Sequence, residues 1–242
     1  RQRIDADTRA ALLALADQAR VPEAIAALFA GDTLNFTENR PALHMALRGG
    51  CPVPPEEAAL LAETDRRQRE FARTLRAGVM CGASGEPIRR VINLGIGGSD
   101  LGPRMVWQAL RPAAARGPIH IDFVANVDPR ELAEALEQAD PRTTLFIVSS
   151  KSFSTLETLA NARAARAWLR AGLGEDADLA PHFVAVSNRL DCATDFGIAP
   201  DRQFAVPEWV GGRFSVWSAV GLPLRLALGE GEFDALQAGA RA

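Results

Sequence analysis

The 242-residue sequence lacks the patterns that mark membrane, secreted and metal-binding proteins. It contains no run of about 18 apolar residues, and no basic segment followed by an apolar one stands at its N-terminus, so we expect neither a membrane span nor a signal peptide. Its three cysteines, Cys51, Cys81 and Cys192, lie far apart and show no Cys-x-x-Cys or Cys/His ligand spacing. We therefore predict free thiols, no metal site and a cytoplasmic location.

The chain also lacks an excess of charge of either sign. Its formal net charge is −3, and its basic residues are scattered, so neither nucleic acid nor an anionic membrane is expected as a partner. All the basic residues but one are arginine, and the single lysine is Lys151. One lysine in so arginine-rich a chain is a hint that a compact ammonium is needed there.

Hydrophobic residues make up 48% of the chain, enough for the core of one large α/β domain, or of one domain with part of a second. The sequence begins at Arg1 rather than Met, and it ends at Ala242 soon after a helical pattern has started. These ends lead us to expect a fragment of a longer protein.

Hydrophobic periodicity predicts helices first and alternating strands and helices afterwards. The expected N-terminal helices span residues 5–30, 41–48 and 56–77. The expected strands span 91–94, 119–127, 144–149, 183–186 and 203–206, and the helices among and after them span 101–110, 129–139, 155–171 and 214–228. Asp128, Pro129 and Glu131 predict a capping box at the start of one of these helices.

Strands that alternate with helices indicate a parallel sheet with helices on both faces, a three-layer α/β/α sandwich preceded by a helical segment. We divide the chain into a helical segment (1–88), an α/β domain (89–228) and the start of another domain (229–242). Right-handed crossovers place the strand-to-helix loops at one edge of the sheet, where ligands of such sheets bind. The loops after Leu94 and after Ser149 are therefore the expected ligand sites.

The first loop, here called the glycine loop, reads Gly-Ile-Gly-Gly-Ser-Asp-Leu-Gly over residues 95–102. Its glycines let an anion approach the backbone, and the following helix N-terminus offers free N–H groups. The dinucleotide fingerprint fails because Asp100 replaces its last glycine, and the P-loop fails because Pro103 replaces its lysine. A tight turn that binds nothing is the alternative.

The second loop, the serine loop, reads Ser-Ser-Lys-Ser-Phe-Ser-Thr-Leu-Glu-Thr over residues 149–158. Several hydroxyls and one ammonium match the three acceptor oxygens and the negative charge of a phosphate monoester. Ser154 and Glu157 also fit a capping box, so the alternative is that some hydroxyls only start a helix.

The third loop, the arginine loop, reads Trp-Val-Gly-Gly-Arg-Phe-Ser-Val-Trp-Ser over residues 209–218. Two glycines before Arg213 allow a backbone path that directs the guanidinium into a cleft, where it would stabilise negative charge developing on an oxygen. Ser215 is a candidate cap for the next helix. The alternative is an arginine that pairs with a carboxylate at a helix start.

Together these loops resemble the glucose-6-phosphate isomerase (phosphoglucose isomerase) family. Residues 93–103, 150–158 and 211–218 are similar to its motifs in the same order, and residues 37–48, Thr-Glu-Asn-Arg-Pro-Ala-Leu-His-Met-Ala-Leu-Arg, are similar to its helical lead-in. The Gly-Gly-Arg-Phe-Ser motif is highly specific to this family. The resemblance implies two sugar-isomerase domains, of which this chain holds the first and the start of the second. It also implies a homodimer with shared active sites, and no cofactor.

The same resemblance implies roles for individual residues in the interconversion of glucose 6-phosphate and fructose 6-phosphate. Arg213 would stabilise the enediolate. Residues that would bind the sugar phosphate are Gly98, Ser99, Ser150, Lys151, Ser152, Phe153, Ser154 and Thr155. Ser152 and Ser154 replace threonines that are common in the family, which keeps both hydroxyls.

The base, the ring-opening histidine and the C-terminal lysine of the family lie downstream of the Arg213 motif. The residues Glu230, Glu232, His120 and His182 do not match their motifs. We therefore expect this chain alone to bind phosphate without turnover.

Two other classes of function stay open. A non-catalytic sugar-phosphate sensor would share a serine-rich loop but would not need the Gly-Gly-Arg-Phe-Ser motif. A nicotinamide-dependent oxidoreductase is disfavoured by the glycine spacing.

Overall fold

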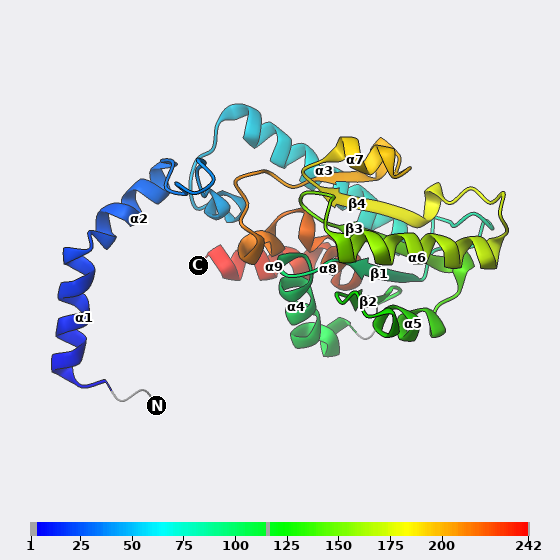
Figure 1. The fold of residues 1–242 in the computed structure, drawn as a ribbon, viewed down its shortest axis with the longest axis horizontal. Helices are drawn as coiled ribbons and strands as arrows, with labels where there is room; N and C mark the ends of the chain where they lie inside the picture. The colour runs from blue at the N-terminus through cyan, green and yellow to red at the C-terminus, as the bar shows by residue number, and fades with distance from the viewer. Residues whose placement is uncertain (1–3, 115–116, 242) are drawn as a thin grey trace.

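The computed structural model describes residues 4–114 and 117–241, so the outermost residues of the expected terminal segments, 1–3 and 242, lie outside it. Its centre is a sheet of parallel strands in the order β2-β1-β3-β4-β5, with helices on both faces (Figure 1). The strands are β1 (Arg90–Leu94), β2 (His120–Val124), β3 (Thr144–Ser149), β4 (Phe183–Ser187) and β5 (Gln203–Ala205). The predicted parallel α/β sandwich is confirmed.

The central strand β3 explains where the two expected ligand loops lie. All of its residues are buried, as expected of a strand covered on both faces. It pairs with β1 so that Leu94 lies opposite Val148. The glycine loop and the serine loop therefore leave the sheet side by side.

Two hydrophobic clusters cover the two faces of the sheet. On one face, α3 (Pro55–Arg76) and α8 (Leu222–Leu228) contribute Phe71, Leu75 and Leu226. On the other face lie α5 (Pro129–Glu137), α6 (Leu156–Leu173) and α7 (Leu190–Asp195). A third cluster joins α8 to α4 (Gly98–Ala114) and to α9 (Glu230–Arg241), whose Phe233 is fully buried.

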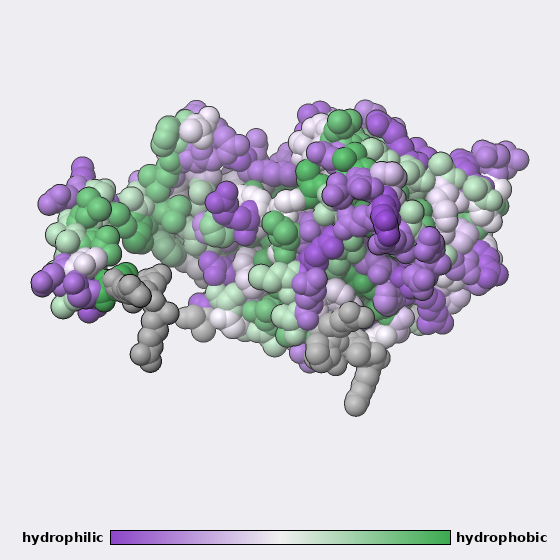
Figure 2. All heavy atoms as spheres, turned by 60° about the horizontal axis from the view of Figure 1, so that its bottom comes forward, coloured by the Kyte–Doolittle hydropathy of each residue, from purple (hydrophilic) through white to green (hydrophobic). Residues whose placement is uncertain are grey.

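The N-terminal arm differs from the single helix expected over residues 5–30. The structure has two helices, α1 (Ala6–Gln18) and α2 (Val21–Ala30), and neither buries a residue. Arg20 breaks the helix with a left-handed backbone at φ 56°, and Pro22 fits the first turn of α2. The arm extends away from the sheet domain (Figure 1), and hydrophobic side chains gather on its surface (Figure 2).

The apolar helix expected over residues 214–228 is also wrong in part. The segment forms two 3₁₀ turns, η5 (Gly212–Trp217) and η6 (Ala219–Gly221), before α8. Ser218 interrupts the helix with an extended backbone, and its hydroxyl accepts from the Val220 N–H. Ser215 does not cap a helix, because its Oγ donates to the carbonyl oxygens of Gly212 and Gly98. A 3₁₀ turn, η1 (His44–Arg48), likewise replaces the helix expected over 41–48.

Both predicted capping boxes are wrong in detail. Asp128 accepts from the Arg130 N–H as expected, but Glu131 accepts from the N–H groups of Ala125 and Asn126 rather than from that of Asp128. At α6 the N-cap is Thr155, without a side-chain cap, and Ser154 Oγ instead donates to Ser152 Oγ at 2.8 Å. The serine-loop hydroxyls therefore do not serve to start the helix.

None of the helices within the described residues has the length and hydropathy needed to cross a bilayer. Over the same residues, no three His, Cys, Asp or Glu side chains come together as metal ligands.

Candidate functional site

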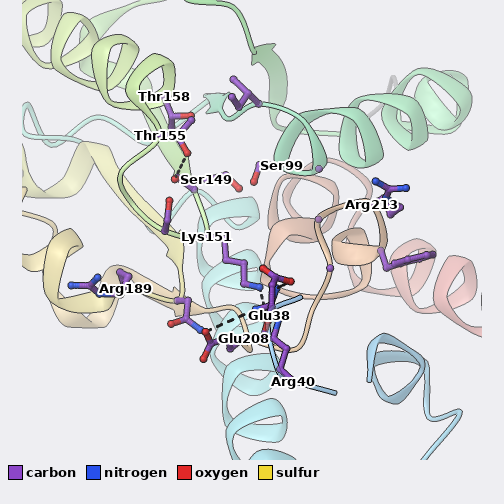
Figure 3. A pocket seen from close by; sticks show the side chains of 18 of the residues that line it. Glu38, Arg40, Ser99, Ser149, Lys151, Thr155, Thr158, Arg189, Glu208 and Arg213 are labelled. Carbon is purple, nitrogen blue, oxygen red and sulfur yellow. Dashed lines mark hydrogen bonds and ion pairs between the residues drawn. The ribbon is translucent and has the colours of Figure 1, made fainter. Parts of the chain in front are cut away.

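A pocket of about 810 Å³ lies at the carboxyl ends of the strands, and all three loops line it (Figure 3). It brings together most of the residues singled out from the sequence. Those that line it are Gly98, Ser99, Ser150, Lys151, Ser152, Thr155 and Arg213. Phe153 and Ser154 are not among the lining residues.

Glycines allow the loops to approach one another at this edge. A Cβ on Gly98 would lie 2.1 Å from the Gly212 carbonyl oxygen, so the glycine loop and the arginine loop are in backbone contact. A Cβ on Gly95 would lie 2.8 Å from the Ser99 Cβ and 2.9 Å from the backbone carbonyl oxygen of Ser149. These two glycines are required by close packing rather than by backbone conformation.

Buried polar side chains hold Ser99 and its neighbour Asp100 in place by hydrogen bonds. Asn93, fully buried on β1, donates from Nδ2 to the Ser99 carbonyl oxygen at 3.1 Å. The neighbouring Asp100 accepts from Arg104 Nε at 2.8 Å, and Arg104 also donates to Glu131. Burial raises the pKa of the Asp100 carboxyl, although the hydrogen bond from Arg104 acts in the opposite direction.

The serine loop folds through an unusual backbone conformation. Phe153 has a φ of +48°, in the left-handed region that non-glycine residues seldom adopt. Its ring is buried and packs against Phe196, which anchors the loop in the core. Ser150 and Thr155 then meet, with 2.9 Å between their hydroxyl oxygens. Phe153 therefore shapes the pocket without lining it.

Lys151 links the serine loop to the arginine loop. Its ammonium donates to the carbonyl oxygens of Glu208, at 2.5 Å, and Val210, at 3.1 Å. Burial lowers the pKa of Lys151, and the nearby guanidinium of Arg40 lowers it further. The ammonium lies in the pocket wall with two carbonyl partners, a contact that the sequence did not predict.

A segment from the N-terminal part of the chain closes one side of the pocket. Asn35, Glu38 and Arg40 line it, and Arg40 donates both to the Glu208 carbonyl oxygen and to the Glu38 carboxylate. Hydrogen bonds from Asn35 and Arg40 lower the pKa of the Glu38 carboxyl. A carboxylate held in this way is a weak base.

Arg213 lies on the opposite side of the pocket from Arg189 (Figure 3). Its side chain is exposed, and within the described residues it forms no ion pair, so the alternative of a helix-start salt bridge does not hold. The next residue, Phe214, stacks on His44 with 3.9 Å between ring centroids. This stacking joins the arginine loop to the N-terminal segment.

The whole chain, residues 1–242, matches the family model of phosphoglucose isomerase. The chain belongs to the phosphoglucose isomerase family. It is 63% identical over its full length to a glucose-6-phosphate isomerase of Aromatoleum aromaticum, of which it covers 44%, and 50% identical to that of Dechloromonas aromatica, of which it covers 45%. It also resembles the crystal structure of a glucose-6-phosphate isomerase from Chlamydia trachomatis, with a TM-score of 0.78, 30% identity, and coverage of 99% of this chain and 47% of that one.

The chain thus spans under half the length of these phosphoglucose isomerase relatives. The carboxylates and histidines that the sequence left unassigned lie outside the pocket. Glu230 faces Arg69 and Arg73, and His120 lies beside Asp122. His182 is fully buried, with Nδ1 against the Thr144 carbonyl oxygen and Nε2 accepting from the Ala83 N–H.

The sequence reasoning missed several residues that line the pocket. Asn188 and Arg189 follow β4, and the rule that ligands bind beyond strand ends could have found them. Glu38 and Arg40 stand in the family lead-in motif, just before the helix expected over residues 41–48, and no binding role is predicted for them. Ser149 and Thr158 flank the binding residues of the serine loop.

Proposed function

We propose that this chain is the phosphate-binding part of a glucose-6-phosphate isomerase. Such an enzyme interconverts glucose 6-phosphate and fructose 6-phosphate, in glycolysis and gluconeogenesis, through a cis-enediol intermediate. The observation that carries the proposal is the convergence of Ser99, Ser150, Ser152 and Thr155 on one pocket beside the only lysine of the chain. Hydroxyl donors and a cation suit a phosphate monoester.

Two helix starts strengthen the attraction for an anion. Ser99 lies in the first turn of α4, and Thr155 is the N-cap of α6. The N-terminal end of a helix carries a partial positive charge and free N–H groups. Two such ends beside one pocket favour a dianion over a neutral sugar.

Arg213 would act on the other end of the substrate. Its exposed guanidinium lines the pocket without a carboxylate partner among the described residues, so it is available to an oxygen of the substrate. Negative charge grows on that oxygen when the enediolate forms, and a guanidinium stabilises it there. We assign this role to Arg213 as part of the proposal.

The proposal also covers the setting of the enzyme. The chain divides into a helical segment (1–88), a first sugar-isomerase domain (89–228) and the start of a second (229–242). The whole enzyme is a cytoplasmic homodimer and has no nucleic-acid partner. We propose further that the base, the ring-opening histidine and the C-terminal lysine come from outside this chain, which alone is inactive.

Calorimetric titration of the 242-residue chain with glucose 6-phosphate, orthophosphate and glucose tests the proposal. We expect the two phosphates to bind competitively and glucose not to bind. A coupled aldose–ketose assay on the same preparation should stay at the level of the blank. Absence of phosphate binding at millimolar concentration would refute the site, and turnover above the blank would refute the inactivity of the chain alone.

A further inference from the structure

The guanidinium of Arg213 is directed by its own backbone. Its side chain is exposed, lines the pocket and has no ion-pair partner within the described residues. An arginine side chain has several rotatable bonds, so ordering it costs conformational entropy. Figure 3 shows Arg213 apart from Lys151 and Thr155, so a change at Arg213 can be measured separately from phosphate binding. The conformation of the arginine loop therefore decides what the guanidinium can contribute.

The backbone of Arg213 is held at both neighbouring residues. On one side, Gly212 lies against Gly98, where an added Cβ would meet the Gly212 carbonyl oxygen at 2.1 Å. On the other side, Phe214 stacks on His44, with 3.9 Å between ring centroids and an interplanar angle of 10°. The first contact is made by backbone atoms and the second by two side chains. Only the second can therefore be removed without changing the glycine loop.

The stack of Phe214 on His44 lies at the edge of the pocket and not in the core. Phe214 is 41% exposed and lines the pocket, whereas His44 is half-buried and is not among the lining residues. Phe214 also belongs to none of the three hydrophobic clusters of the described residues. Removing the stack should therefore destabilise the fold less than a core substitution would.

His44 gives the stack a firm support. It begins η1, whose Leu47 is buried. Gln237 donates to the Leu47 carbonyl oxygen at 2.6 Å, and Arg48 donates to the Ala240 carbonyl oxygen at 2.7 Å, so this turn is tied to α9. Burial lowers the pKa of the His44 imidazole, and Arg48 lowers it further. The ring is therefore neutral at pH 7 and packs as an aromatic ring.

We infer that His44 is a positioning residue for Arg213 and acts on it through Phe214. This inference rests on the proposed function, in which the guanidinium stabilises the enediolate. Stacking on His44 fixes Phe214, and with it the backbone from which the neighbouring guanidinium enters the pocket. His44 itself contacts no reacting group. Its contribution should therefore appear in binding of the enediolate and not in binding of the substrate phosphate.

An enediolate analogue separates these two kinds of binding. In the hydroxamate of a five-carbon aldonic acid 5-phosphate, a planar N–C=O group replaces the two enediolate carbons and places negative charge on oxygen. Arg213→Ala should weaken binding of this analogue by about tenfold or more, the size of a hydrogen bond to a charged group.

His44→Leu and Phe214→Leu each remove one ring of the stack and keep an apolar side chain. Each should weaken binding of the analogue by about two- to tenfold, the size of an aromatic pair. Glucose 6-phosphate should bind both variants within about twofold of the wild type, because ground-state binding does not use Arg213. Calorimetric titration of the 242-residue chain measures both affinities.

Two further variants distinguish a positioning role from a merely structural one. His44→Phe keeps a flat, neutral ring and should bind the analogue as the wild type does. The double variant His44→Leu/Arg213→Ala should bind it no more weakly than Arg213→Ala alone, because no guanidinium is left to position. If thermal unfolding shows that His44→Leu does not fold, Phe214→Leu, whose native ring is partly exposed, takes its place in the test.

The outcomes separate this inference from the proposed function. If the wild type binds neither glucose 6-phosphate nor the analogue, or if Arg213→Ala binds the analogue normally, the proposed function fails and the inference with it. If Arg213→Ala weakens binding of the analogue but His44→Leu and Phe214→Leu do not, only the inference is refuted. Equal losses of affinity for both ligands, or losses that add in the double variant, would refute it too, because the stack would then shape the whole pocket.

Discussion

Replacing Gly98 with alanine tests whether contact between the glycine loop and the arginine loop builds the pocket. The new Cβ would lie 2.1 Å from the Gly212 carbonyl oxygen, 2.4 Å from its carbon and 2.7 Å from its Cα. All three atoms belong to the backbone, so no side chain can rotate away, and the loops must separate by on the order of 1 Å to reach ordinary contact distance. The φ of Gly98 is not positive, so the clash alone decides the result.

We expect Gly98→Ala to lower the free energy of unfolding by about 1–3 kcal/mol, the usual range for overpacking. The separation also displaces Ser99, a proposed phosphate-binding residue, and disturbs the hydrogen bond from Ser215 to the Gly98 carbonyl oxygen. Affinity for glucose 6-phosphate should therefore fall as well. Urea unfolding and calorimetric titration measure the two effects.

Gly239→Ala provides the control, because Gly239 lies in α9 and its added Cβ would meet no atom within 4 Å. Alanine favours a helix over glycine, so this variant should be as stable as the wild type or slightly more stable. If Gly98→Ala matches Gly239→Ala in stability and binds glucose 6-phosphate normally, the loop contact does not determine the pocket and the reasoning is refuted.

Three further predictions follow from single residues. Lys151→Met should weaken phosphate binding and flatten its salt dependence, because Lys151 is the one basic residue of the serine loop and lines the pocket; calorimetry in low and high salt checks this. Arg213→Ala should leave glucose 6-phosphate affinity within about twofold of the wild type, because a group that acts on the enediolate adds little to ground-state binding; a large loss would reassign Arg213 to binding. Burial lowers the pKa of His182, so the folded protein binds fewer protons than the unfolded chain below about pH 6.5, and urea midpoints should fall as the pH drops from 7 to 5. His182→Gln should be less stable at pH 7 but flatter over that range, and an equal slope in both proteins would contradict the assignment.

Local patterns predicted the sheet domain because its strands are short, apolar and followed by capping or glycine signals. The range of β3 agrees with the prediction, and the parallel order follows from alternation with helices. The breaks at Arg20 and Ser218 could not be predicted in this way. Each depends on one residue leaving helical geometry inside a sequence that favours a helix throughout.

The sequence also predicted which loops form the site, since strand ends in a parallel sheet meet at one edge. It could not predict which groups each side chain contacts. The carbonyl partners of Lys151 come from residues more than fifty positions later, and Arg40 reaches the same carbonyl from the N-terminal segment. The burial of the Phe153 ring and the unpaired hydroxyl of Thr158 depend on packing that no local pattern encodes.

The helices of the N-terminal arm have a consequence for handling this chain. Helices of 13 and 10 residues that bury no side chain gain little from packing, and isolated helices of that length are marginal in water. Their amide protons should exchange with solvent far sooner than those of β3, and a protease should cut between residues 6 and 30 while the sheet stays intact. Limited digestion would then leave a core that begins before Asn35 and keeps the complete wall of the pocket.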